Sequence, residues 1–266
     1  MHRRTFSRKY LGIPHAAFLL LFVAAPLIVL IYYAFTNGQG EFTVQNMTGF
    51  FSDPNTLGTL CYSFGVALVT TAVCLLLAYP LAYILATSRL KGKSVIVLIF
   101  IMPMWINFSL RITALKEILT WIEGNLAYHP FLNTVLGMSY DFLPFMILPL
   151  YSVMTKIPDS VIEAAQDLGA NASKILMRVL IPMTVPGIST GIIMVFVPSV
   201  STFIISRMLG GGGNLLIGDL IDLQFLGNAY NPNLGAAIAL VLMVLILLCM
   251  SITNQFGDEE KGDLLK

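Results

Sequence analysis

Charge is scarce in this chain. Asp, Glu, Lys and Arg make up only 11% of its 266 residues, and hydrophobic residues make up 57%, whereas soluble domains carry about 25% charge. A soluble monomer could not hide so much apolar surface, so we expect an integral membrane protein. The net charge is +1, and no nucleic-acid recognition module with a basic face is present. Nucleic acid is therefore not an expected partner.

Cysteine and histidine are also few. The three cysteines, Cys61, Cys74 and Cys249, lie within or at the ends of apolar runs and form no C-x-x-C pair. This excludes a disulfide framework and argues against a zinc site. The three histidines lie too far apart in the sequence to make a local metal site. We expect neither a metal nor a cofactor.

Long apolar runs are what the chain has instead. A helix that rises about 1.5 Å per residue needs about 20 apolar residues to cross a hydrocarbon core of about 30 Å. Lipid cannot satisfy free backbone groups, so runs of this length are expected to be helices. The sequence predicts an all-α bundle of six transmembrane helices in a single domain over residues 1–266. The runs are Ala16–Phe35, Cys61–Ala86, Val95–Leu115, Gly137–Met154, Thr184–Ile205 and Leu234–Ile252.

Basic residues indicate the orientation of these spans. The first run is too long for a secretory signal, so we read it as an uncleaved helix. When six spans are threaded alternately, twelve of the 15 Lys and Arg residues fall on one side, which predicts that both termini are cytoplasmic. These twelve are Arg3, Arg4, Arg8, Lys9, Arg89, Lys91, Lys93, Lys156, Lys174, Arg178, Lys261 and Lys266.

The stretch 156–182, between the fourth and fifth runs, is called the hairpin segment below. It reads as two short helices with a turn between them. Ser160 and Glu163 have the spacing of a capping box, which predicts a helix that starts near Val161. Gly169 is placed to end this helix, because glycine adopts the left-handed conformation at low cost.

A second short helix is expected after the turn. Asn171 or Ser173 could cap it, and Pro182 is expected to break its pattern. On the first helix, Ala164 and Ala165 leave room for another protein to approach the backbone closely. Glu163 and Asp167 add one negative edge to that helix. The sequence thus predicts a helix–turn–helix on the cytoplasmic face.

The hairpin segment resembles the coupling loop of ABC-importer permeases. That loop has the form E-A-A, three residues, G, nine residues and I-x-L-P. The same spacing is present here in Glu163-Ala164-Ala165, Gly169 and residues 179–182 (V-L-I-P). The departures are Val in place of Ile and Ile in place of Leu. An ordinary amphipathic hairpin is the alternative. The resemblance implies a type I importer permease fold in a bacterial inner membrane. It also implies that the helix around Glu163–Leu168 docks on a separate ATPase subunit.

The same resemblance implies a set of partners. They are a second permease chain, two cytoplasmic ATPase subunits that hydrolyse ATP, and an extracytoplasmic solute-binding protein, besides the small solute and the membrane lipid. The chain itself is expected to have no catalytic role. Residues 92–94 (G-K-S) are similar to the end of a P-loop, but Thr87 occupies the first glycine position. Residues 187–191 (G-I-S-T-G) fit a nucleophile motif, but no histidine follows, so these small residues indicate close helix packing instead.

Most of the chain is similar to the B-type permease subunit of spermidine/putrescine importers. The similar stretches are Phe108–Leu115, the fourth run with its continuation, and Leu209–Leu226. Permeases for iron, sulfate, molybdate, thiamine or phosphonate remain alternatives. An ion-coupled secondary carrier is a further alternative, against which the sequence shows no internal repeat and keeps its acidic residues near the predicted outer surface.

A polyamine needs carboxylates for its ammonium groups and aromatic faces for cation–π contacts. Asp141 beside Tyr140, at the predicted outer mouth of the fourth span, is the candidate pair, with Trp105 and Phe108 as aromatic walls. A solvated carboxylate and lipid-facing rings are the alternatives.

Arg111 is costly inside a bilayer, so it should face an interior cavity or reach the surface. Asp141 or Glu117 would suit it as a partner. A cation repels cations, so Arg111 weakens the hypothesis that the third span binds a polyamine directly.

Overall fold

A computed structural model describes residues 12–88, 92–213, 215–227 and 229–263. Within these residues every regular element is a helix, and one isolated bridge pairs Thr36 with Phe42. The all-α class is therefore confirmed. The chain divides into two compact units, each described by itself: Met1–Leu57 with Ile221–Val244, and Gly58–Leu220 with Leu245–Lys266. The prediction of one domain over the whole chain stays a prediction.

Two asparagine side chains, Asn233 and Asn46, join elements of the smaller unit. The Asn233 side-chain amide donates to the carbonyl oxygens of Thr36 (2.7 Å) and Tyr33 (3.1 Å), and Asn46 donates to those of Ala34 (3.1 Å) and Thr36 (2.9 Å). These bonds reach carbonyls at and just beyond the end of helix α2, where a helix leaves acceptors without intrahelical partners. The helices of this unit are α1 (Gly12–Leu19), the π-helical turn η2 (Leu20–Ala24), α2 (Ala25–Ala34), α3 (Gln45–Ser52) and the first part of α13 (Pro232–Asp263).

The helix α4 begins with a side-chain cap. The two carboxylate oxygens of Asp53 accept the backbone N–H groups of Asn55 and Thr56, both at 3.1 Å, and the Thr56 hydroxyl also donates to this carboxylate. Two of the free N–H groups of the first turn are thereby satisfied. The hydrogen bond from the Thr56 side chain is the main cause that lowers the pKa of Asp53 from its ordinary value.

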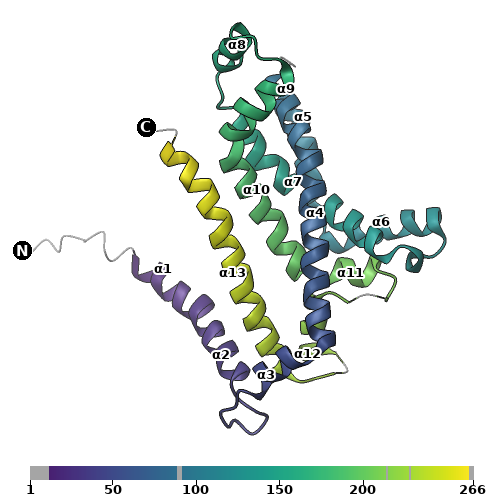
Figure 1. Ribbon diagram of the computed structural model, residues 1–266. Coiled ribbons are helices and arrows are strands. Elements are labelled where there is room, and N and C mark those ends of the chain that lie inside the picture. Colours follow the sequence, from purple (N-terminus) through teal and green to yellow (C-terminus); the bar gives the residue numbers. More distant parts are fainter. Residues whose placement is uncertain (1–11, 89–91, 214, 228, 264–266) are drawn as a thin grey trace, which may run out of the picture. The chain divides into compact units, whose positions relative to one another are not determined.

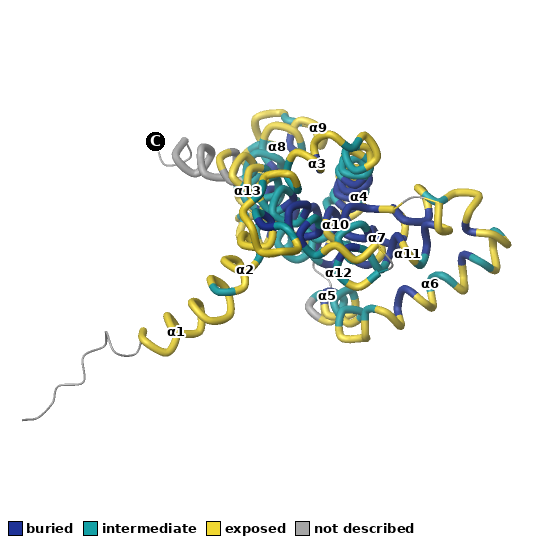
Figure 2. The backbone as a smooth tube through the Cα atoms, turned by 90° about the horizontal axis from the view of Figure 1, so that it is seen from below, coloured by how far each residue is buried: buried dark blue, intermediate teal, exposed yellow. Residues whose placement is uncertain are grey.

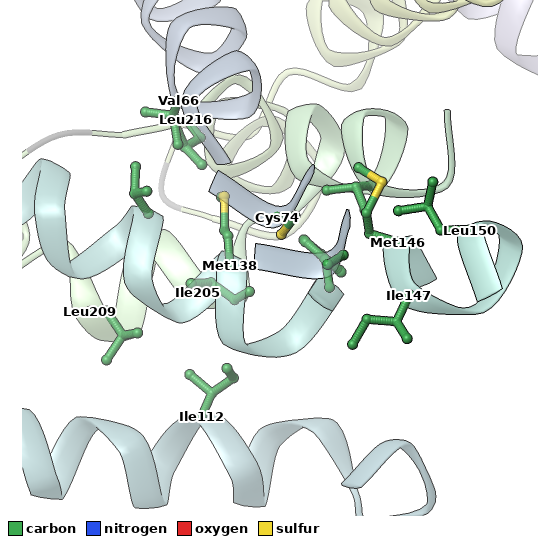
Figure 3. Packing of buried hydrophobic residues seen from close by; sticks show 14 of the residues in the cluster. Val66, Cys74, Ile112, Met138, Met146, Ile147, Leu150, Ile205, Leu209 and Leu216 are labelled. Atoms are coloured by element: carbon green, nitrogen blue, oxygen red, sulfur yellow. The ribbon is translucent and has the colours of Figure 1, made fainter. Parts of the chain in front are cut away.

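The larger unit has its core along α4, α7 and α10, where Figure 2 shows many of the residues coloured as buried. Met138, Met146 and Leu150 of α7 lie within this core, and Ile112 contributes from α6 (Figure 3). The elements of this unit (Figure 1) are α4 (Pro54–Thr87), α5 (Lys93–Ile101), η3 (Met102–Trp105), α6 (Phe108–Glu123), η4 (Leu126–Tyr128), α7 (Pro130–Met154), α8 (Asp159–Asp167), α9 (Ala172–Ile175), η5 (Leu176–Leu180), α10 (Ile181–Ser201), α11 (Ile204–Leu209) and α12 (Ile217–Leu226), of which α4 and α12 cross the unit boundary.

Five helices are long and apolar enough to cross a membrane, and a bent helix pair brings the number to six. Together they overlap all six predicted runs, and several begin or end well outside the predicted bounds. The five are Gly12–Ala34, Pro54–Thr87, Pro130–Met154, Ala172–Ser201 and Pro232–Thr253.

The third predicted run, Val95–Leu115, is not one helix, so its prediction as a continuous span was wrong. Its two halves meet at a bend of 95°. Pro103 lies in the short 3₁₀ turn η3, and Ile106 is extended with ψ 141°. A proline removes one backbone donor from the helix. The Asn107 side chain then accepts the N–H groups of Ser109 (3.0 Å) and Leu110 (3.4 Å) and starts a new helix, α6.

Two glycines let α7 and α10 pack closely, as the small-residue motif at 187–191 predicted. A Cβ atom on Gly187 would lie 3.1 Å from the Pro149 carbonyl oxygen and 3.1 Å from Val153 Cγ2. A Cβ on Gly191 would lie 2.5 Å from Met146 Sδ. The helices therefore approach so closely that any larger residue at these positions would require a neighbouring side chain or the backbone to shift.

This packing gives a test of stability. Replacing Gly187→Leu should lower the free energy of unfolding by about 1–3 kcal/mol, because the side chain must push the two helices apart. The matched control is Gly65→Leu on α4, where a Cβ would meet nothing within 4 Å. Thermal unfolding in detergent measures both. Equal losses in the two variants would show that the α7–α10 approach is not limited by Gly187.

Candidate functional site

Two regions carry the residues that the sequence singled out: the hairpin segment and a buried ion pair. The first helix of the hairpin segment begins two residues before the predicted start at Val161. Helix α8 starts at Asp159, and its N-cap is Pro158, with no side-chain capping bond. The capping box of Ser160 and Glu163 was therefore wrong. Pro158 is extended (φ −67°, ψ 141°), so the chain enters the helix directly after it, and Ser160 lies inside the first turn.

Gly169 ends α8 as predicted. Its φ is +75°, in the left-handed region. Its N–H donates to the Gln166 carbonyl at 2.8 Å, and the Ala170 N–H donates to the Ala165 carbonyl at 3.0 Å. This pair of bonds is the Schellman motif, which satisfies two carbonyls at the helix end. The turn of the hairpin segment thus depends on a residue that can hold a positive φ.

Asn171 begins the second helix, and its side chain accepts the Lys174 N–H at 2.9 Å. The prediction that Pro182 breaks this helix was wrong, because α9, η5 and α10 form one helix over Ala172–Ser201. Residues 176–180 make a π turn, in which the Ile181 N–H donates to the Leu176 carbonyl. The extra residue in this turn removes the clash that a proline ring makes with the carbonyl four residues earlier. The second short helix is therefore the first part of the fifth span.

The outer surface of α8 is open. Glu163, Ala164, Asp167 and Leu168 are all exposed. Figure 1 shows α8 past the ends of α7 and α10, at the opposite end of the larger unit from α11. The motif residues therefore face outward on one short helix, and docking of an ATPase on them stays a prediction.

The second region is a buried ion pair between Arg111 of α6 and Asp141 of α7. The Arg111 Nη2 atom lies 2.5 Å from Asp141 Oδ1, and the two residues are 8% and 3% exposed. The expected place of Asp141 at the mouth of a span was wrong. Helix α7 begins at Pro130, seven residues before the predicted run, so Asp141 lies well inside the helix. Of the two carboxylates proposed as partners of Arg111, the structure pairs it with Asp141.

The ion pair lies on the wall of a hollow of about 390 Å³, which we call the ion-pair cavity. Phe108 lines it, as the sequence analysis expected of an aromatic wall. Trp105 and Tyr140 do not line it; they are 81% and 46% exposed on the chain. The complete lining is Met104, Phe108, Arg111, Asp141, Phe142, Phe145, Pro198, Ser201 and Thr202.

The sequence analysis did not predict most of the residues that line the ion-pair cavity. Phe145 follows Asp141 by four residues, so helical spacing could have placed both on one face. Ser201 ends α10 and Thr202 is its C-cap. No sequence signal linked this helix end to Asp141, because the two are joined only by the packing of α10 on α7.

Apart from Arg111, the electrostatics of the cavity favour a cation. Asp141 carries a formal negative charge, and the carboxyl end of α10 adds the partial negative charge of a helix C-terminus. The rings of Phe108, Phe142 and Phe145 offer faces that attract cations. Arg111 is at present the cation on this site. Among the described residues there is no group of three or more potential metal ligands.

Comparison with known proteins agrees with this architecture. Residues 10–256 match the family model of the binding-protein-dependent transport system inner membrane component. The chain belongs to this family of multi-pass inner membrane proteins.

Among individual proteins, the chain is similar to the spermidine/putrescine transport system permease protein PotB. It is 34% identical to PotB of Escherichia coli over 249 residues, which cover 86% of this chain and 90% of that protein. It is 32% identical to PotB of Haemophilus influenzae, with 87% of each chain covered. Its fold is similar to that of a chain in the crystal structure of a bacterial alginate ABC transporter in complex with an alginate pentasaccharide-bound periplasmic protein. The TM-score is 0.69 and the sequence identity 17%, and the match covers 93% of this chain and 92% of that chain.

The ion pair can be tested by a double-mutant cycle. Arg111→Met or Asp141→Leu alone should lower the free energy of unfolding by about 3–5 kcal/mol, because each leaves an uncompensated buried charge. The double variant should recover most of this loss, because no charge is then left unpaired. Thermal unfolding of the purified proteins measures the three values. Additive losses would contradict a buried, coupled pair.

Proposed function

We propose that this chain is a permease subunit of an ABC importer for polyamines such as spermidine and putrescine. The observation that carries the proposal is the 34% identity to PotB over 86% of the chain. The ion-pair cavity supports it independently, because its carboxylate, aromatic rings and helix C-terminus suit an organic cation. In this proposal Asp141 and Phe108 belong to the solute path. The cavity does not support Trp105 and Tyr140 as direct contacts.

The hairpin segment is proposed to couple the chain to an ATPase subunit. Glu163, Ala164, Ala165 and Asp167 would form the docking surface on α8, with Gly169 holding the turn behind it. The continuous helix over Ala172–Ser201 supports this role. A displacement of the hairpin segment would pass directly into the fifth span, because no break in the helix absorbs it.

The remaining parts of the importer follow from the same proposal. A second permease chain completes the solute path, two ATPase subunits hydrolyse ATP, and an extracytoplasmic binding protein delivers the solute. Docking of cytoplasmic ATPases on α8 requires that the hairpin segment and both termini face the cytoplasm. Of the twelve basic residues that predict this orientation, eight lie outside the residues whose side chains the structure describes: Arg3, Arg4, Arg8, Lys9, Arg89, Lys91, Lys261 and Lys266.

Uptake assays test the solute. Proteoliposomes that contain the assembled importer and its binding protein should accumulate labelled spermidine only when ATP is enclosed in the lumen, where the ATPase subunits of inward-transporting complexes lie. Unlabelled putrescine should compete, whereas sulfate, molybdate and thiamine should not. Uptake driven by a proton or sodium gradient without ATP would contradict an ABC importer. ATP-driven uptake of one of the other solutes, with none of spermidine, would contradict the polyamine assignment alone.

Gly169 tests the coupling. Gly169→Val should reduce ATP-dependent uptake by at least about tenfold while ATP hydrolysis continues, because a β-branched residue is strained at φ +75° and displaces α8. The matched control is Gly169→Asn, which should keep most of the uptake because Asn tolerates this conformation. Uptake and hydrolysis are measured on the same proteoliposomes. Full uptake by the Val variant would show that the turn does not position the docking surface.

A further inference from the structure

We infer that Arg111 is an internal counter-ion that the solute replaces: an ammonium group of the polyamine takes the place of the guanidinium at Asp141. The inference rests on the proposed function and assigns Arg111 a part in it. The cavity that the chain offers to a cation already holds one, which belongs to the protein. Binding of the solute is then an exchange of one cation for another, and the cavity need not hold two.

The site around Asp141 is built for a cation independently of Arg111. The carboxylate is 3% exposed and lies in the interior of α7. The carboxyl end of α10 reaches the same cavity through Ser201 and Thr202. Three phenylalanine rings complete its wall. Ammonium groups suit the carboxylate and the helix end, and the methylene chain between two ammonium groups suits the rings.

The guanidinium is held loosely for a buried group. A strong Arg–carboxylate pair is bidentate and satisfies several N–H donors at once. Here the ion pair is made through Nη2, and within the described residues Nε and Nη1 of Arg111 have no hydrogen-bond partner. Arg111 also lies in the first turn of α6, where the partial positive charge of the helix N-terminus disfavours a cation. A purely structural pair would be expected to satisfy more of these donors.

Pairing with Arg111 stabilises Asp141 when no solute is bound. A lone carboxylate buried among apolar side chains is strongly destabilising. While Arg111 occupies Asp141, the site is neutral and stable without solute. When an ammonium group binds Asp141, the carboxylate stays paired, and Arg111 turns its guanidinium away from it. A neutral solute of the same length cannot drive this exchange, so the pair selects for organic cations.

Equilibrium binding tests the exchange. The assembled complex of permeases and ATPases, without the binding protein, is titrated with spermidine by calorimetry. Arg111→Gln should bind spermidine at least about fivefold more tightly than the wild type, because the competing cation is gone while a polar side chain remains. Asp141→Asn should bind at least about fivefold more weakly, and the double variant should resemble Asp141→Asn.

A milder variant guards against loss of folding. Arg111→Lys keeps a cation in the cavity on a shorter side chain that reaches Asp141 less well, so spermidine should bind between about twofold and tenfold more tightly than to the wild type. Unchanged or weaker binding in Arg111→Lys and in any Arg111→Gln complex that assembles would overturn the inference. If the wild-type importer takes up spermidine and these variants do not tighten binding, only the exchange fails. If the wild type neither takes up nor binds spermidine, the polyamine function and the exchange fail together.

Discussion

The structure depends on one constraint: inside a bilayer every backbone N–H and C=O group must find its partner within the protein. Long unbroken helices meet this demand without help. At two places where a helix bends or holds a proline, the chain departs from regular helix in a way that accommodates the change. The Asn107 side chain caps α6 after the 95° bend, and the π turn at residues 176–180 carries the fifth span past Pro182. Both departures from regular helix lie beside the regions that we propose to be functional.

The fifth span joins these two regions. Its first residue follows the turn at Gly169 and Asn171, and its last residue, Ser201, lines the ion-pair cavity. Between them the glycines at 187 and 191 hold it against α7, which carries Asp141. One helix therefore touches the proposed ATPase contact at one end and the proposed cation site at the other. No separate relay between the two regions is required.

The sequence predicted the class of fold and the family because both depend on local and strongly patterned signals. Apolar runs mark helices, and the E-A-A to Gly spacing marks the hairpin segment. The end of α8 was predicted because a positive φ selects glycine. Its start was not, because the extended Pro158 starts the helix before Ser160 could cap it.

The position of Asp141 shows a different limit. Hydropathy placed the start of the fourth span after Asn133 and Thr134, since polar residues count against a membrane helix. In the structure these side chains are buried and each donates a hydrogen bond: Asn133 to Glu123 (2.9 Å) and Thr134 to the Pro130 carbonyl (2.8 Å). The helix therefore includes them, and Asp141 moves from the expected surface into the interior. Hydrogen bonds of this kind depend on how the folded chain places the side chains, and composition alone does not reveal them.

The tight approach at Gly187 and Gly191 has a mechanical consequence for the fifth span. If the helix tilts about its most closely packed point, its two ends move in opposite directions. We take this pivot to lie midway between Gly187 and Gly191. At about 1.5 Å per residue, it is roughly 25 Å from the end at Ala172 and roughly 18 Å from the end at Ser201. A push at the Ala172 end would reach the cavity reversed in direction and reduced in size by about 30%.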